Sequence, residues 1–172
     1  YGKNRGVDDV DTGQYNTSTE SDFISGASIF MRGKVLEQIG FLDEKYFLYF
    51  EDSDLAKRVT EAGFRIYYNG KVSLYHKVSQ STGIGSKTTD YYHTRNRLIF
   101  GIKYGKLRTK FALLREALKL ILVGRPAQRQ GVLDYYLGLT GGKPELMAPV
   151  TNIEYPFKLS IGIVNYNTAD LT

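Results

Sequence analysis

The chain has 172 residues, a formal net charge of +5 and 42% hydrophobic residues, a balance typical of a folded domain. It contains no cysteine, which excludes disulfides, thiolate metal ligands and a thiol nucleophile. No apolar run approaches the roughly 20 residues that span a bilayer, and the first residues do not resemble a signal peptide. We therefore expect a cytoplasmic segment of a longer protein.

Charge is distributed unevenly along the chain. Residues 1–60 carry 7 basic and 11 acidic side chains, whereas residues 61–172 carry 16 and 7. Between positions 95 and 129 there are 10 basic side chains and 1 acidic one. This pattern suits carboxylate chemistry beside an anionic ligand such as a phosphate, but a solvated basic face explains it equally well. No nucleic-acid-binding motif accompanies the basic segment.

The first third of the chain combines loop and element signals. Residues 1–22 are rich in Gly, Asp, Asn, Thr and Ser, which predicts a long loop. The apolar residues 23–31 predict a buried strand that bends at Ser25 and Gly26. Residues 34–39 predict a short helix that ends at the following glycine.

A second helix and a hairpin follow. Apolar spacing predicts a helix over residues 54–62. Residues 64–68 and 72–76 alternate like strands around an Asn-Gly pair, which predicts a β-hairpin.

Helical signals dominate the next segment. Residues 77–90 are polar and predict a loop, with a helix beginning near Tyr91. Residues 107–123 predict an amphipathic helix and residues 128–139 a weaker one. Five apolar side chains form the stripe of the first: Leu107, Phe111, Leu114, Leu118 and Ile121.

The C-terminal part begins a new unit. Gly141 and Gly142, with the prolines that follow them, predict a linker over residues 143–157. Residues 158–172 open with a short apolar run, which predicts the buried parallel strand of a further α/β unit.

Residues 25–76 carry five motifs in order: SGA, GFLDE, FLYFEDSDL, a helix ending AGFR and a strand ending YH. Together they resemble the acceptor half of family 2 glycosyltransferases of the GT-A fold, particularly bacterial rhamnosyltransferase-like and galactofuranosyltransferase-like members. The resemblance implies an α/β fold in which residues 1–105 form the acceptor-side half of a GT-A domain with a mixed sheet. Residues 106–142 are then a helical extension, and residues 158–172 the first strand of a second GT-A-like module.

The resemblance identifies Asp52 as the general base, which removes the proton of an acceptor hydroxyl as its oxygen attacks the donor sugar with inversion. Glu51 would orient the loop or bind acceptor hydroxyls, and Ser25 and Gly26 would line the acceptor pocket. Acidic residues near a helix N-terminus are also common as stabilising caps, so the spacing alone leaves this alternative open.

A metal site is also implied. Metal-dependent members of the family use a His at the place of His76 to hold Mn²⁺ or Mg²⁺ on the donor diphosphate, and imidazole with carboxylates suits Mn²⁺ better. The family's Asp-x-Asp motif should lie far upstream. Asp9 and Asp11 have that spacing but lie too close to Asp52, so we expect the nucleotide-binding half to be missing and the isolated chain to be inactive.

Further contacts to the donor follow from the resemblance. Arg95 would clamp the leaving diphosphate, although a solvated helix arginine is an equal alternative. Lys87 would lie on a lid over the donor. In the second module, the matching N-Y-N motif would contact the nucleotide: Asn165, Tyr166 and Asn167.

The helical segment 107–139 has two interpretations. We favour packing of its apolar stripe on the catalytic domain, with peripheral membrane contact as an addition. Five basic residues would face the lipid headgroups: Lys106, Arg108, Lys110, Arg115 and Lys119.

The expected protein is an inverting, metal-dependent glycosyltransferase. It would use a UDP- or dTDP-sugar and a glycan or lipid-linked acceptor, in the cytoplasm or peripherally at the inner face of the plasma membrane. A non-catalytic glycan-binding or membrane-docking module on the same fold is the alternative. A nucleic-acid binder would instead show steeply salt-dependent binding, and we expect no nucleic acid as a partner.

Overall fold

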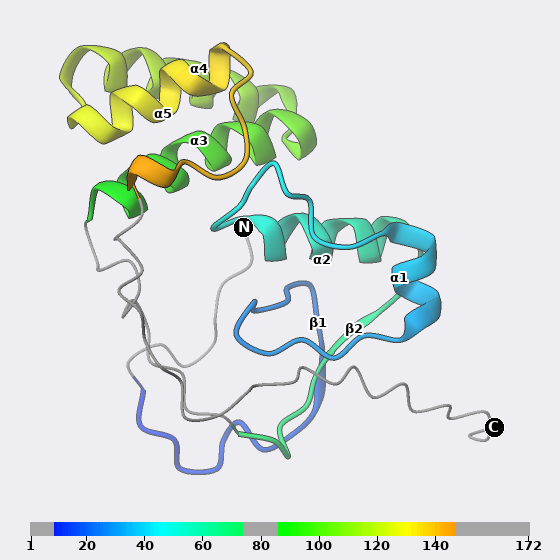
Figure 1. Ribbon diagram of the computed structural model, residues 1–172. Coiled ribbons are helices and arrows are strands. Elements are labelled where there is room, and N and C mark those ends of the chain that lie inside the picture. Colours follow the sequence, from blue (N-terminus) through cyan, green and yellow to red (C-terminus); the bar gives the residue numbers. More distant parts are fainter. Residues whose placement is uncertain (1–8, 74–85, 147–172) are drawn as a thin grey trace, which may run out of the picture.

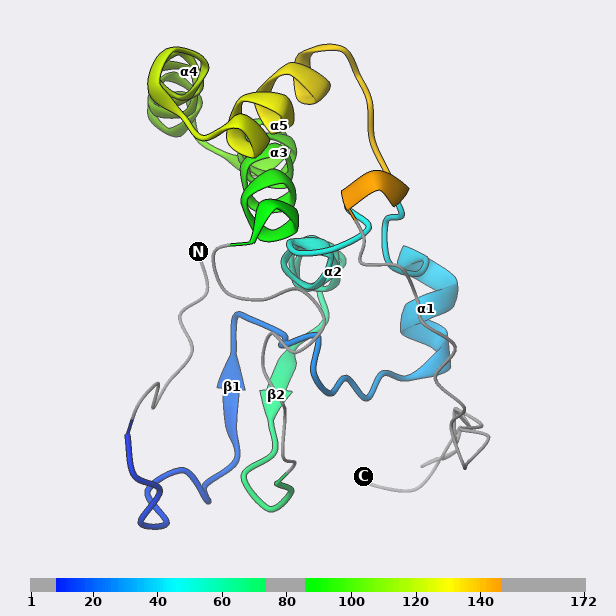
Figure 2. The same cartoon turned by 60° about the vertical axis from the view of Figure 1, so that its left-hand side comes forward.

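The computed structural model describes residues 9–73 and 86–146. The elements in these ranges are β1 (Thr19–Ser21), α1 (Gly33–Ile39), α2 (Glu51–Glu61), β2 (Ile66–Tyr68), α3 (Lys87–Tyr104), α4 (Leu107–Val123), α5 (Pro126–Tyr136) and the 3-10 turn η1 (Pro144–Leu146). Helices α3, α4 and α5 form one layer, and α2 lies between this layer and the two strands (Figures 1 and 2). Helix α1 lies beside α2.

The strands form a two-stranded antiparallel sheet in which Glu20 faces Tyr67. Strand β2 confirms part of the strand predicted at 64–68. Its partner β1 lies within residues 1–22, so the prediction of a loop throughout that segment is wrong. Gly70 makes this pairing feasible, because a Cβ there would lie 2.5 Å from the Tyr15 carbonyl oxygen. In the predicted second hairpin arm, residues 72 and 73 are not in a strand, and residues 74–76 lie outside the described residues.

The strand predicted at residues 23–31 is wrong. The segment turns at Ser25, whose carbonyl oxygen accepts a hydrogen bond from the Ser28 amide at 3.3 Å. Phe30 is 78% exposed. The Ser-Gly pair therefore ends the extended conformation instead of bending a continuing strand, and the turn comes to lie against the start of α2.

The predicted helices α1 and α2 are confirmed, with different starts. Helix α1 ends at Gly40, whose φ of 77° is left-handed. Helix α2 begins at Glu51, three residues before the predicted start, since its acidic first turn complements the helix dipole. Both helices pack around one apolar cluster, which also holds Ile66 of β2: Val35, Leu55, Ala56, Val59 and Ile66.

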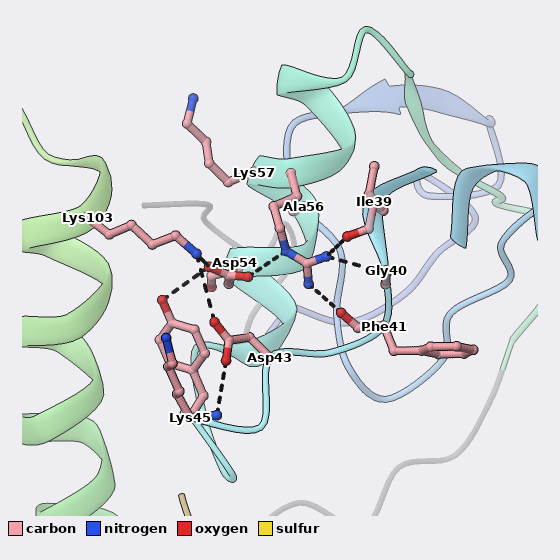
Figure 3. Close-up of polar contacts among 12 residues, drawn as sticks. Ile39, Gly40, Phe41, Asp43, Lys45, Asp54, Ala56, Lys57 and Lys103 are labelled. Carbon is pink, nitrogen blue, oxygen red and sulfur yellow. Dashed lines mark hydrogen bonds and ion pairs between the residues drawn. The ribbon is translucent and has the colours of Figure 1, made fainter. Parts of the chain in front are cut away.

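A polar network around the buried Asp54 connects α2 to its neighbours (Figure 3). Arg58 donates to the carbonyl oxygens of Ile39 at 2.6 Å and Phe41 at 2.7 Å, which caps the end of α1. Its Nε donates at 2.7 Å to the fully buried carboxylate of Asp54. From α3, Lys103 donates to Asp54 at 2.7 Å. Asp54 therefore has the structural role that its place inside a helix suggests.

The helical layer follows its predicted bounds in part. Helix α4 covers Leu107–Val123, as predicted. Helix α3 begins at Lys87 with Ser86 as its capping residue, so the end of the predicted 77–90 loop is helical. The weaker helix appears as α5, shifted towards the N-terminus. Two glycines let these helices approach closely: a Cβ on Gly101 would meet Leu113 at 2.2 Å, and one on Gly131 would meet the Tyr91 carbonyl oxygen at 2.8 Å.

The predicted stripe of α4 does not face the core. The buried side chains of α4 are Leu113 and Ala117, which join Leu98 and Val132 in a second apolar cluster. Ile121 is the one member of the stripe that packs against this cluster. The mixed sheet, the GT-A description and the domain boundaries stay predictions, and the proposed second module lies outside the described residues.

Candidate functional site

Glu51 and Asp52 are the first two residues of α2. The N-cap of this helix is Phe50, so neither carboxylate is the capping residue. Asp52 accepts hydrogen bonds from the Gly26 amide at 3.1 Å and from the Ser53 amide at 2.7 Å. Two main-chain N–H groups thus orient the Asp52 carboxylate, and no cation neutralises it among the described residues.

The turn at Ser25 and Gly26 lies directly on this carboxylate pair. A Cβ on Gly26 would lie 3.6 Å from an Asp52 carboxylate oxygen and 3.8 Å from a Glu51 carboxylate oxygen. The structure therefore brings together four of the predicted site residues from two segments about 25 positions apart. Ser25 is exposed and its hydroxyl oxygen lies 3.5 Å from the Ala27 amide.

A cavity of about 400 Å³ opens beside Glu51. Apolar side chains, carboxylates and bare glycine backbone line it: Leu42, Asp43, Glu44, Phe47, Glu51, Gly141 and Gly142. Apolar surfaces combined with a few hydrogen-bond acceptors are the usual lining of a small-molecule site, and carboxylates are suitable acceptors for sugar hydroxyls. Glu51 connects this cavity to Asp52.

Glu51 is unusual among the carboxylates that the structure describes. Burial raises the pKa of its carboxyl, and the neighbouring charge of Asp52 raises it further. Its Oε2 atom is buried without a hydrogen-bond partner in the described structure. A half-buried carboxylate with one unsatisfied oxygen at a cavity is the environment in which acid–base and binding groups are found.

The loop before α2 is strained. Phe47, Tyr49 and Phe50 have φ angles of 62°, 66° and 73°, although none is glycine. Each such residue costs roughly 1–3 kcal/mol, and such conformations persist only where surrounding contacts enforce them. Here the enforcing contacts come from two consecutive residues of α3, Arg95 and Asn96.

Asn96 is fully buried and faces the main chain of this loop. Its Nδ2 atom lies 2.8 Å from the carbonyl oxygen of Tyr46, 2.7 Å from that of Leu48 and 2.9 Å from that of Tyr49. Sequence reasoning gave this residue no role, because an asparagine inside a helix carries no signal that its partners are distant carbonyls.

Arg95 is only 1% exposed, so the alternative of a solvated helix arginine is wrong. All five of its N–H donors have partners within the protein. They donate to the carbonyl oxygens of Lys45, Tyr46 and Gly141, to the Tyr91 hydroxyl and to the Asn96 side chain. A diphosphate would have to displace these bonds, so we do not include Arg95 in the donor site and assign it to holding the loop.

Of the remaining predicted site residues, the structure describes Lys87. Lys87 is the exposed first residue of α3. His76, Asn165, Tyr166 and Asn167 lie outside the described residues. Asp9 and Asp11 accept local bonds, from the Tyr15 hydroxyl and the Gly13 amide respectively.

The described ranges contain neither a group of metal-binding side chains nor a helix that could span a membrane. Across residues 9–73 and 86–146, no three His, Asp or Glu side chains are grouped so as to hold a metal ion. These residues alone therefore do not form the predicted Mn²⁺ or Mg²⁺ site. In the same ranges, no helix combines the length and the apolar character needed to cross a bilayer.

Comparison with known proteins finds a partial match to a sugar transferase. Over 78 residues, the chain is 32% identical to the N-acetylglucosaminyl-diphospho-decaprenol L-rhamnosyltransferase of two Mycobacterium tuberculosis strains. The chain is similar to a glycosyltransferase. The match covers 45% of the chain and 25% of each transferase, so the chain spans about a quarter of the length of these relatives. No protein-family model and no solved structure matches the chain.

Proposed function

We propose that the chain contributes the acceptor side of an inverting glycosyltransferase, which transfers a sugar from a nucleotide-diphosphate donor to a saccharide or lipid-linked acceptor. The observation that carries the proposal is the pair Glu51–Asp52, oriented by the Gly26 turn beside an apolar and acidic cavity. The similarity to a rhamnosyltransferase whose name specifies N-acetylglucosaminyl-diphospho-decaprenol supports a sugar donor and a lipid-linked acceptor.

In this reaction, a hydroxyl of the acceptor attacks the anomeric carbon of the donor. Asp52 takes the hydroxyl proton as the new glycosidic bond forms, and the bond from the sugar to the diphosphate oxygen breaks on the opposite face. Main-chain N–H groups hold the Asp52 carboxylate in one orientation. Glu51 accepts a hydrogen bond from a second acceptor hydroxyl at the cavity.

The donor side is proposed from the resemblance alone. The donor is a UDP- or dTDP-sugar, and His76 is one ligand of an Mn²⁺ or Mg²⁺ ion on its diphosphate. The same proposal includes the GT-A fold and a nucleotide-binding half on a different part of the protein. It also includes nucleotide contacts by the N-Y-N residues of the second module.

Replacement of the base tests the proposal most directly. In the full-length protein, Asp52→Asn should lower sugar transfer by about 10²–10⁴-fold while the affinity for the nucleotide sugar is retained. Glu61→Gln is the matched control, since Glu61 is an exposed carboxylate at the other end of α2. Unchanged turnover in Asp52→Asn would remove this residue from the mechanism. Saccharide binding without transfer in the unmodified protein would favour the non-catalytic binding module.

The donor site has its own test. Calorimetric titration of UDP and of dTDP, with and without Mn²⁺, should show metal-dependent binding that weakens in His76→Ala. Equal binding by the His76→Ala variant would exclude this histidine as a ligand.

A further inference from the structure

Helix α4 has two apolar faces, and only one of them is covered. Leu113 and Ala117 are buried against α3 and α5. A second group of large apolar side chains on the same helix is 45–74% exposed: Leu107, Phe111, Leu114, Leu118 and Leu122. At about 100° per residue, these five positions fall within an arc of roughly 80°, so they form one continuous stripe. We call these five residues the exposed stripe.

Basic residues border the exposed stripe. Arg108, Arg115 and Lys119 are exposed and lie along one edge of it by the same helical spacing, while Lys110 lies along the other. The acidic residue of this helix, Glu116, is paired with Arg97 of α3 at 2.6 Å, which neutralises its charge. The surface around the stripe is therefore apolar in the middle and positive at its edges.

The position of α4 leaves this surface accessible. In Figure 2, α4 is seen nearly end-on at the outer side of the helical layer, remote from α2 and from the two strands. A flat surface can therefore contact α4 along its length of about 25 Å without meeting the sheet.

We propose that α4 docks in the plane of an anionic lipid bilayer. The exposed stripe enters the boundary between headgroups and acyl chains, and the four basic residues contact phosphate-bearing headgroups. A helix with an apolar stripe flanked by Lys and Arg is the arrangement that binds such interfaces. A protein partner could also bury the apolar stripe, but binding to a protein does not explain the positive charge on both edges of the stripe. This proposal does not depend on the chain's having transferase activity.

Vesicle binding by the full-length protein tests this. At physiological salt we expect cosedimentation with phosphatidylcholine vesicles that contain phosphatidylglycerol, and little with phosphatidylcholine alone. Phe111→Ser or Leu118→Ser should weaken binding by about tenfold, and Arg115→Gln or Lys119→Gln by about fivefold each. Val72→Ser and Lys71→Gln are the matched controls, because both residues are exposed near the sheet, and they should bind as the unmodified protein does.

A spectroscopic measurement locates the contact. The 172 residues contain no tryptophan. In a protein whose remaining sequence also lacks tryptophan, Leu118→Trp introduces a single fluorophore in the stripe. Its emission should shift to the blue and be quenched by brominated lipid, whereas that of Val72→Trp should not. Absence of binding, or equal effects at positions 72 and 118, would overturn the proposal. It would also be overturned if the unmodified protein ignored vesicles and formed a dimer that Phe111→Ser dissociated, since a second copy would then cover the stripe.

Discussion

The side-chain nitrogen of Asn96 lies 2.9 Å from the carbonyl oxygen of Tyr49, two residues before the catalytic candidate Glu51. Tyr49 has a φ of 66°, and the same nitrogen also contacts the carbonyl of Leu48. A fully buried amide on α3 therefore determines the path of the strained loop that leads into the carboxylate pair.

Removal of this amide should affect both stability and activity. Asn96→Ala removes the hydrogen bonds of this side chain to the loop carbonyl oxygens and should lower the free energy of unfolding by about 1–3 kcal/mol, as measured by urea denaturation. Because the loop then relaxes, kcat should fall more than the KM for donor rises. Thr94→Ala is the control on the same helix. An Asn96→Ala protein with normal stability and normal kcat would contradict a positioning role.

Arg95 distinguishes a structural role from a donor-binding one. Arg95→Lys replaces five fixed donors by three on a flexible stem, so the free energy of unfolding should fall by about 2–4 kcal/mol. The affinity of the folded protein for UDP or dTDP should not change. A stable variant with weakened nucleotide binding would restore Arg95 to the diphosphate site.

The stability contribution of Glu51 should depend on pH. Burial and the charge of Asp52 raise the pKa of this carboxyl above the value of 4.5 that it has when unfolded, so ionisation at neutral pH destabilises the fold. Glu51→Gln should therefore raise the Tm at pH 7. The advantage should disappear as the pH falls to about 4, where the carboxyl is protonated in both states. If Glu51→Gln had a lower Tm than the unmodified protein at pH 7, and by the same amount at pH 4, the charge of Glu51 would not be the cause of the stability difference.

Asp54 should behave in the opposite way. Burial alone raises the pKa of its carboxyl, but hydrogen bonds from Lys103, Arg58 and Tyr104 outweigh burial and hold the pKa below the ordinary value of 3.8. The stability from this network is complete above about pH 4 and is lost as the pH falls through the lower pKa of the folded state. Asp54→Asn should lower the free energy of unfolding by about 3 kcal/mol at pH 7. The difference in stability between Asp54→Asn and the unmodified protein, measured by thermal denaturation, should become smaller in acid. A constant difference from pH 7 to pH 2 would contradict this assignment.

The elements that could be predicted depend on local signals. The bounds of α4 follow from its apolar spacing, and Gly40 ends α1 where the sequence places it. The acidic residues 51 and 52 lie in the first turn of a helix, as their motif indicates. Each of these features is determined by residues within a few positions of one another.

The features that could not be predicted depend on distant partners. Periodicity shows that α4 has apolar faces, but the contact of Leu113 with Gly101 decides which face is covered. The sequence of residues 19–21 predicts a loop, and these residues form a strand because they pair with β2. The burial of Arg95 similarly depends on carbonyl groups about 50 positions away.

The bonds of Arg95 also have a geometric consequence. This side chain donates to the carbonyl oxygens of Lys45, which follows the cavity-lining Glu44, and of Gly141, which itself lines the cavity, so both are attached to α3. Helix α4 packs on the same helix through Leu113. If α4 rests on a bilayer, the cavity stands at a constant height above the headgroups. The distance of an acceptor hydroxyl from its lipid anchor, more than the affinity of the acceptor, would then determine which hydroxyl contacts Asp52.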